Sequence, residues 1–182
     1  MQNEHSERAI TEARDLIQDL RTIDSQDPLE NLFRAAGPEL AAAWRGTDDS
    51  PAYRVTVEGV PKPLLAVTQE EIFRIGREAL TNAFQHANAT QIEAAINYGE
   101  RLFSLRISDD GMGIERTVLM QGAREGHWGL PGIRERAKRI GGQLEIWSDT
   151  QSGTEVELRI ASTIAYAKSQ IRRRPGLSHE GT

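Results

Sequence analysis

LLAVTQEEIFRIGREALTNAFQHA, residues 64–87, carries the clearest helical pattern in this chain. Its apolar side chains recur at spacings of three and four residues, at Ile72, Ile75, Ala79, Leu80, Ala83 and Ala87. Side chains spaced in this way lie on one face of an α-helix, so the segment predicts an amphipathic helix over residues 64–87.

Two alternating segments follow, at residues 91–98 and 102–108, with Gly99-Glu100-Arg101 between them. Alternating apolar and polar side chains on both sides of a short turn predict a β-hairpin. Because strands paired by hairpins are grouped apart from the helices, the sequence favours an α+β sandwich over an alternating parallel α/β fold.

Further elements extend the pattern on both sides. Before the long helix we expect a helix with an apolar face from Leu29 to Trp44, interrupted near Gly37-Pro38, and a strand at residues 53–58. After the hairpin we expect a helix at residues 130–140 and a strand pair at residues 143–148 and 154–161.

A length of 182 residues corresponds to about one domain plus an extension, at ~150 residues per domain. We expect residues 1–25 to form a helical extension and linker, residues 26–161 the domain, and residues 162–182 a polar, disordered tail. Within the extension, a narrow apolar seam is typical of a helix that pairs with another. The seam consists of Ile10, Ala13, Ile17 and Leu20.

Composition excludes several classes of function. The 22 basic against 27 acidic residues give a net charge of −5, which argues against a nucleic-acid partner. The absence of cysteine excludes disulfides, thiolate catalysis and Cys-ligated metals. No apolar run approaches the ~18 residues of a membrane span, so we expect a cytoplasmic chain without direct membrane contact.

Three polar residues of the long helix, Glu78, Asn82 and His86, are spaced i, i+4, i+8 and share one side of it. Such a line could border a pocket or form a solvated helix edge. The amide oxygen of Asn82 suits a hard cation such as Mg²⁺, which takes oxygen ligands and shares them with substrate phosphates.

Asp109-Asp110-Gly111-Met112-Gly113 follows a predicted strand. A carboxylate fixed there could accept a hydrogen bond from an exocyclic amine, while the glycines let a flat ring approach the backbone. The alternative interpretation is a polar turn, since Asp-Gly is a frequent turn pair.

Two glycine-containing segments complete the set. Gly126, Gly129 and Gly132 surround the start of a helix, whose free N–H groups could bind phosphates, and Ser152-Gly153-Thr154 forms a turn with hydroxyl groups. Loop flexibility and an ordinary hairpin turn are the alternatives. The chain has neither a Gly-x-x-x-x-Gly-Lys-Ser/Thr loop nor Gly-x-Gly-x-x-Gly after a strand, so a nucleotide would need another cradle.

These four motifs, in this order, resemble the N, G1, G2 and G3 boxes of the GHKL ATPases. Residues 77–83 (REALTNA) and 129–136 (GLPGIRER) are most similar to the nitrate-sensor-like subfamily of bacterial two-component sensor histidine kinases. The resemblance covers residues 29–161. It implies a Bergerat-type two-layer α/β sandwich, with a mixed, mainly antiparallel sheet backed by helices and ATP held between two helices under a lid.

The resemblance also implies an adenine site. Asp109 would bind the adenine amine, with Gly113 helping through water, Gly111 letting the ring approach and Thr154 lying near the ring. These roles come from motif position.

The same correspondence implies a phosphate site. Asn82 would ligate Mg²⁺ that bridges the ATP phosphates, Glu78 would polarise a metal-bound water or orient the reacting group, and His86 would lie near the phosphates. The hinge and the phosphate-facing helix start would be formed by Gly129, Leu130 and Gly132. The lid would be residues 115–128.

Two features depart from the subfamily pattern. Trp128 stands between His127 and Gly129, where the pattern runs Gly-His-Gly-Leu. His5-Ser6-Glu7 does not match a phosphoacceptor motif, and the helix at residues 4–23 resembles the end of the second helix of a dimerisation domain.

The resemblance therefore implies the ATP-binding catalytic domain of a sensor histidine kinase, in the cytoplasmic portion of a membrane-anchored protein. Its partners would be the dimerisation and phosphoacceptor domain of the same full-length kinase and a response regulator. The alternatives are an anti-sigma-factor serine kinase and a non-catalytic ATP-binding docking module.

Overall fold

The computed structural model describes residues 27–43, 50–114, 129–150 and 152–167. Its elements, in chain order, are α2 (Leu29–Ala43), β1 (Ala52–Gly59), α3 (Ala66–His86), β2 (Gln91–Tyr98), β3 (Leu102–Asp109), α5 (Gly129–Arg139), β4 (Gln143–Asp149), β5 (Gly153–Ala161) and α6 (Ser162–Ala165).

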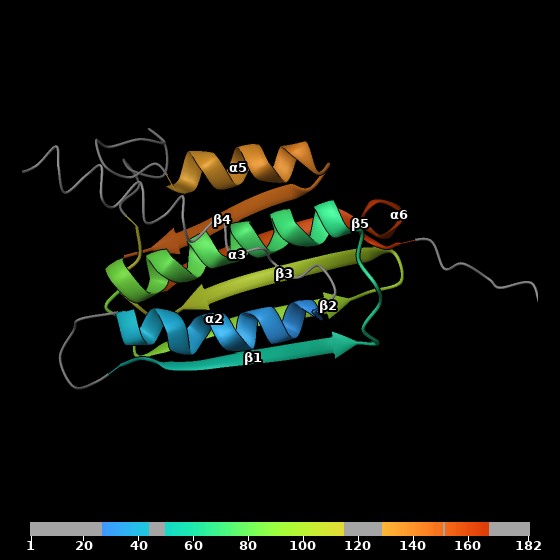
Figure 1. Ribbon diagram of the computed structural model, residues 1–182. Coiled ribbons are helices and arrows are strands. Elements are labelled where there is room, and N and C mark those ends of the chain that lie inside the picture. Colours follow the sequence, from blue (N-terminus) through green and yellow to red (C-terminus); the bar gives the residue numbers. More distant parts are fainter. Residues whose placement is uncertain (1–26, 44–49, 115–128, 151, 168–182) are drawn as a thin grey trace, which may run out of the picture.

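The strands form one five-stranded sheet in the order β1-β2-β3-β5-β4. β1 pairs parallel to β2, and the other three pairings are antiparallel. Figure 1 shows α2, α3 and α5 stacked over one face of this sheet. The expected two-layer sandwich with a mixed, mainly antiparallel sheet is confirmed.

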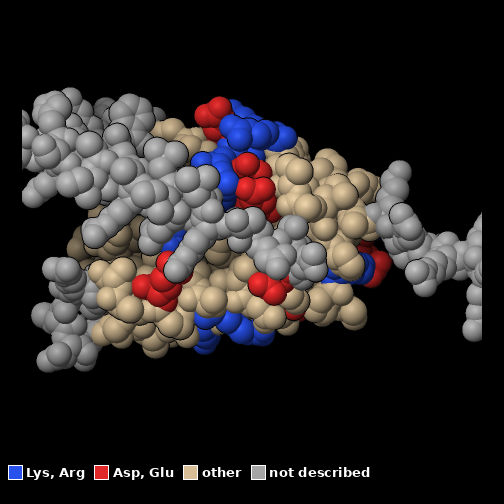
Figure 2. Space-filling view, viewed as in Figure 1, with Lys and Arg blue, Asp and Glu red and all other residues tan. Residues whose placement is uncertain are grey.

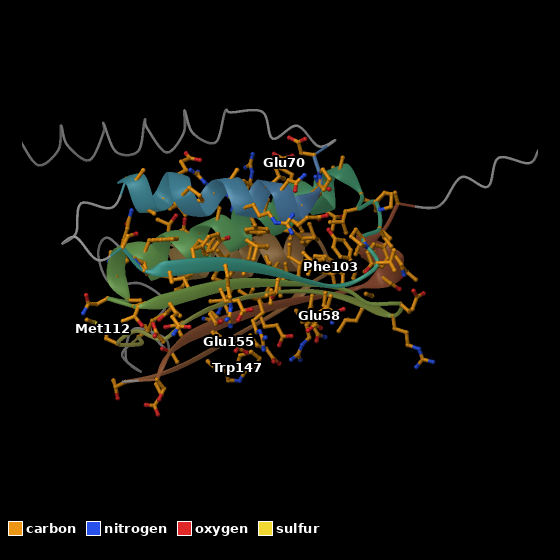
Figure 3. All side chains as sticks on the ribbon, turned by 90° about the horizontal axis from the view of Figure 1, so that it is seen from below. Glu58, Glu70, Phe103, Met112, Trp147 and Glu155 are labelled. Carbon is orange, nitrogen blue, oxygen red and sulfur yellow. The ribbon has the colours of Figure 1, made fainter. Side chains whose placement is uncertain are left out.

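Alternating burial along the strands produces the two layers. Ile96, Phe103, Leu105 and Leu158 are at most 1% exposed and pack beneath Ile72, Ile75 and Leu80 of α3. The side chains between them face away from the helices, as Figure 3 shows for Glu58, Trp147 and Glu155. The period-two pattern of the sequence therefore corresponds directly to a covered face and an open face of the sheet.

α2 corrects one expectation. The sequence predicts an interruption near Gly37-Pro38, but the helix runs unbroken from Leu29 to Ala43 with Pro38 inside it. The ring of Tyr53 lies so close to Gly37 that an added Cβ would come within 2.0 Å of it, and the Tyr53 hydroxyl donates to Phe33 O at 3.0 Å. Packing against β1 therefore outweighs the hydrogen bond that proline removes.

The packed fold also continues past Ala161, where we expect the domain to end. Residues 162–165 form α6, the Leu65 N–H donates to Ala165 O at 2.9 Å, and Ala165 is fully buried. Tyr166 forms an antiparallel bridge with Leu64. Six residues of the expected polar tail are thus part of the described fold.

Several expectations lie outside the described residues. These are the helical seam at residues 4–23, the lid at residues 115–128 with Gly126, His127 and Trp128, Trp44 in the apolar face of the first helix, and the end of the tail. Among the described helices, none is long and apolar enough to cross a bilayer.

Candidate functional site

Asp109 ends β3 on the sheet face that the helices cover, because it alternates with buried Ile107. Its Oδ1 accepts a hydrogen bond from the Gly111 N–H at 2.9 Å, and Thr154 is its register partner on β5. Burial raises the pKa of the Asp109 carboxyl, while backbone N–H groups of Gly111 and Thr154 counter part of the rise. A half-buried carboxylate with remaining acceptor capacity is suited to an amine donor.

Asp110, the next residue, has a different environment. Its Oδ1 accepts from the Thr90 and Gln91 N–H groups at 2.8 Å each, and its Oδ2 accepts from the Thr90 hydroxyl at 2.6 Å. These bonds, led by that of the Thr90 hydroxyl, lower the pKa of Asp110. Asp110 therefore fixes the start of β2, and Asp109 is the aspartate of the pair that faces the site.

The glycines after Asp109 allow two close backbone approaches. An added Cβ on Gly111 would lie 2.1 Å from Ala87 O, and one on Gly113, whose φ is +73°, would lie 2.3 Å from Asp149 O. The Met112 N–H also donates to Ala87 O at 2.8 Å. The segment is thus held between the end of α3 and the β4–β5 hairpin, a position that only glycine fits.

Sequence reasoning missed Ser148. Its Oγ accepts from the Ile114 N–H at 2.7 Å, donates to Gly153 O at 3.1 Å and lies 3.1 Å from Thr154 Oγ1. It therefore joins the loop after β3 to the β4–β5 hairpin beside Thr154. The available signal was its register in β4, where a polar side chain continues the partly buried positions of Leu144 and Ile146.

The three polar residues of α3 singled out in the sequence, Glu78, Asn82 and His86, begin on the side of the helix that faces α5. Glu71 forms ion pairs with Arg136 and Arg139 of α5, at 3.3 and 3.6 Å. Glu78 and Asn82 follow Glu71 by seven and eleven residues, within roughly 20° of the same direction around the helix. Both are half-buried. The structure thus places Glu78 and Asn82 along the α3–α5 boundary.

α3 and α5 run antiparallel, since the beginning of α3 meets the end of α5 at Glu71 and Arg136. Seven residues forward in α3 lead to Glu78, and seven residues back in α5 lead to Gly129, each a rise of about 10 Å. The first turn of α5 therefore lies level with Glu78, and Asn82 lies one turn further on. Figure 1 shows this end of α5 above the sheet end at which β3 and β4 finish.

One side of the first turn of α5, at Gly132, is not covered by any of the described residues. A Cβ added to Gly132 would meet no described atom within 4 Å, whereas Ile133 and Ala137 on the opposite side are 1% exposed. Leu130 is half-buried and packs at the core margin. Free N–H groups at a helix start attract anions, so this turn can bind phosphate oxygens.

His86 is the last residue of α3 and is exposed. The structure thus gathers the predicted residues at one end of the molecule: Asp109, Gly111, Gly113 and Thr154 on the sheet side, Glu78, Asn82 and His86 on α3, and Gly129, Leu130 and Gly132 on α5.

A hollow of about 520 Å³ opens at this end of the sheet. Its lining includes Asp109, Ser148 and Thr154, together with Trp147 and Glu155. Because Trp147 and Glu155 point to the open face of the sheet (Figure 3), the hollow extends around the β4–β5 hairpin. Only its part next to Asp109 adjoins the candidate site.

The donor set fits a nucleotide with a cation shared by its phosphates. Within the described ranges, no three histidine or acidic side chains come together as a metal cage. An Mg²⁺ ion would then take one protein oxygen, from Asn82, and complete its shell with phosphate oxygens and water. The half-buried carboxylate and the open helix start supply the two remaining needs, an amine acceptor and an anion site.

Comparison with known proteins gives the family and the fold. Residues 67–164 match the family model described as histidine kinase-, DNA gyrase B-, and HSP90-like ATPase. The histidine kinase domain of the Erythrobacter litoralis EL346 blue-light activated histidine kinase superposes with a TM-score of 0.60 at 24% identity, covering 75% of this chain and 62% of that one. At this identity the structural likeness concerns the fold.

Three curated relatives are sensor proteins. The sensor histidine kinase LiaS of Bacillus subtilis is 30% identical over 50% of this chain and 24% of its own length. The NarQ homolog of Haemophilus influenzae is 37% identical over 51% of this chain and 16% of its own. A sensor-like histidine kinase of Chloroflexus aurantiacus is 30% identical over 69% of this chain and 20% of its own. The chain thus spans a quarter or less of these relatives.

Proposed function

This chain belongs to the histidine kinase-, DNA gyrase B- and HSP90-like ATPases, and from that membership we propose that it is the ATP-binding catalytic domain of a two-component sensor histidine kinase. The observation that carries the proposal is the half-buried Asp109 carboxylate, set across one end of the sandwich from the open first turn of α5. Sensor kinases among the relatives support the same assignment.

In the proposed complex, Asp109 accepts a hydrogen bond from the adenine amine, Gly111 and Gly113 let the ring approach the backbone, and Thr154 borders it. The first turn of α5, with Gly129, Leu130 and Gly132, directs N–H groups at the phosphates. Recognition of ATP is therefore divided between two parts of the fold. The end of the sheet selects the adenine base, and the first turn of α5 binds the negatively charged phosphates.

On α3, Asn82 supplies the protein oxygen for Mg²⁺, Glu78 orients the reacting group and His86 borders the phosphates. Mg²⁺ held at Asn82 would supply charge neutralisation on the phosphates. The proposed reaction breaks the bond between the γ-phosphoryl group and ADP and forms a bond to the imidazole nitrogen of an acceptor histidine, with ADP as the leaving group. Phosphoryl transfer asks little covalent chemistry of the protein, so these residues act by positioning and electrostatics.

The acceptor histidine belongs, in this proposal, to the dimerisation domain of the same full-length kinase, and a response regulator receives the group afterwards. Because the reaction consumes ATP, the proposal places the domain on the cytoplasmic side of a membrane-anchored sensor.

The chain alone is expected to bind ATP with Mg²⁺ without accumulating phosphohistidine, since His5-Ser6-Glu7 lacks the acceptor pattern. Adding the dimerisation domain of the same kinase in trans, with ATP labelled at the γ-phosphate, should label that domain on histidine. Label on serine of a separate protein would favour the anti-sigma-factor alternative. ATP binding with no transfer to the dimerisation domain would leave the docking-module alternative as the better account.

Asn82→Ala is expected to abolish the Mg²⁺ dependence of ATP binding while the fold is kept, because the amide oxygen is the proposed protein ligand. Titrations of ATP with and without Mg²⁺ measure this dependence. Gln85→Ala is the matched control, since Gln85 lies three residues further along α3 and is exposed. An Asn82→Ala protein whose ATP affinity still responds to Mg²⁺ would place the cation elsewhere.

A further inference from the structure

Glu71 is a nearly buried acidic residue that the nucleotide chemistry does not use. The residue is 8% exposed. It lies on α3, away from the strands that line the base site. Arg136 Nη1 approaches its Oε2 at 3.3 Å, and Arg139 Nη1 approaches its Oε1 at 3.6 Å. Figure 2 shows basic side chains gathered over α5 with acidic side chains directly beside them. One carboxylate thus links the last turn of α5 to α3.

The link is at the opposite end of α5 from the phosphate-facing turn. Arg136 and Arg139 lie in the last turn of α5, while Gly129 and Gly132 lie in the first, where a Cβ on Gly132 would meet no atom of the described residues within 4 Å. A helix of three turns moves as one rigid body. The position of Gly129 along α3, level with Glu78, therefore depends on how firmly the last turn of α5 is attached.

Burial of the carboxylate favours this attachment. Glu71 is 8% exposed, whereas the side chains of Arg136 and Arg139 are 30% and 59% exposed, so the buried charge depends on the two guanidinium groups for its compensation. Arg136 and Arg139, three residues apart in the last turn of α5, both approach Glu71, so the carboxylate holds this turn against α3. The direction of the α5 axis decides whether its first N–H groups point toward Asn82.

We propose that Glu71 is a positioning residue of the ATP site, which sets the first turn of α5 against the Mg²⁺ side of α3. The inference rests on the proposed function. It differs from a purely structural role in one respect: the base site at Asp109 belongs to the sheet, so loss of Glu71 weakens the phosphate part of ATP recognition and leaves the adenosine part unchanged.

The test compares ATP with adenosine. Glu71→Gln keeps the size of the side chain and removes its charge, and it is expected to lower the affinity for an ATP analogue with Mg²⁺ by about tenfold, since small misplacements of binding groups are costly. The affinity for adenosine, followed by nuclear magnetic resonance titration, should stay as in the wild type. The ratio of the two affinities is the readout.

Glu70→Gln is the matched control. Glu70 adjoins Glu71 in the chain, lies on the outer side of the helical layer (Figure 3) and pairs with Arg74 within α3 at 2.7 Å. It should leave the ratio unchanged. Should Glu71→Gln fail to fold, Arg139→Gln provides the second variant, because this side chain is 59% exposed and removes only one arm of the link. It should lower the ratio by a smaller factor.

An unchanged ratio in the folded variants would overturn the positioning role while leaving the proposed function standing. Equal losses for ATP and adenosine would also overturn it, because they indicate general destabilisation. A wild-type chain that binds adenosine but gains nothing from the triphosphate would contradict the proposed function and this inference together.

Discussion

Asp109→Asn is expected to weaken ATP binding by ~1–3 kcal/mol, because the adenine amine loses its charged acceptor and meets an amide in its place. The carboxylate accepts from the Gly111 N–H, so its position is set before the nucleotide arrives. Burial already raises the pKa of Asp109, so a neutral amide removes a desolvation cost and should not destabilise the fold. Isothermal calorimetry with a non-hydrolysable analogue measures the loss of affinity.

Asp110→Asn is the control for this substitution, since the two aspartates are adjacent and have opposite environments. The pKa of Asp110 is lowered by its bonds to Thr90 and Gln91, so its charged form stabilises the folded state. That contribution is present above the unfolded pKa and is lost as pH falls through the lower folded pKa. Asp110→Asn should therefore reduce stability at neutral pH and spare ATP affinity. Unchanged affinity in Asp109→Asn would move the adenine site elsewhere.

Gly153→Ala is expected to reduce the free energy of unfolding by about 2–4 kcal/mol. Gly153 has a φ of +81°, and an added Cβ would lie 1.9 Å from Asp109 O and 3.0 Å from Asp110 Cα. Relief requires the start of β5 to move away from the end of β3, which also displaces the Asp109 backbone. Urea unfolding measures the loss of stability, and ATP affinity should fall with it.

Gly132→Ala separates this effect from that of glycine replacement in general. Its Cβ would enter open space, and alanine is favoured over glycine within a helix by up to about 1 kcal/mol. The fold should keep or gain stability. Wild-type stability in Gly153→Ala would mean that the β4–β5 turn does not approach Asp109 as closely as described.

Most helices and strands of the fold could be predicted from the local periodicity of apolar residues. The three-and-four spacing from Ile72 to Ala87 located α3, and the alternation on both sides of Gly99 located the β2–β3 hairpin, because both patterns report which side chains face a core. The parallel pairing of β1 with β2 has no comparable local signal. It depends on α3 crossing between them, and the family resemblance implied a mixed sheet without saying which strands pair parallel.

Expectations differed from the structure where tertiary contacts outweighed local preference. Proline predicts a break in α2, but Tyr53, from the next element β1, packs against Gly37, and the helix is unbroken. The segment after Ala161 is expected to be a polar tail, yet Ala165 is fully buried and backbone pairing with Leu64 and Leu65 fixes residues 162–167. Neither partner could be found from spacing alone.

Part of the candidate site could be predicted from the sequence, and part required the structure. Motif order selected the residues near Asp109 and Asn82 as candidates, since their spacing within one segment is visible in the sequence. The distinction between Asp109 and Asp110, the contacts of Ser148 and the convergence of two arginines on Glu71 all join segments far apart in the chain. They required the register of β3 with β5 and the antiparallel packing of α3 with α5.

Calorimetric titration with a non-hydrolysable ATP analogue, with and without Mg²⁺ and with a GTP analogue as the control, tests the central claim most directly. The account predicts binding that is selective for adenine and strengthened by Mg²⁺, because Asp109 reads an amine donor and Asn82 holds the cation. Equal affinity for the two analogues, or no binding of either, would contradict an ATP site at this end of the sandwich.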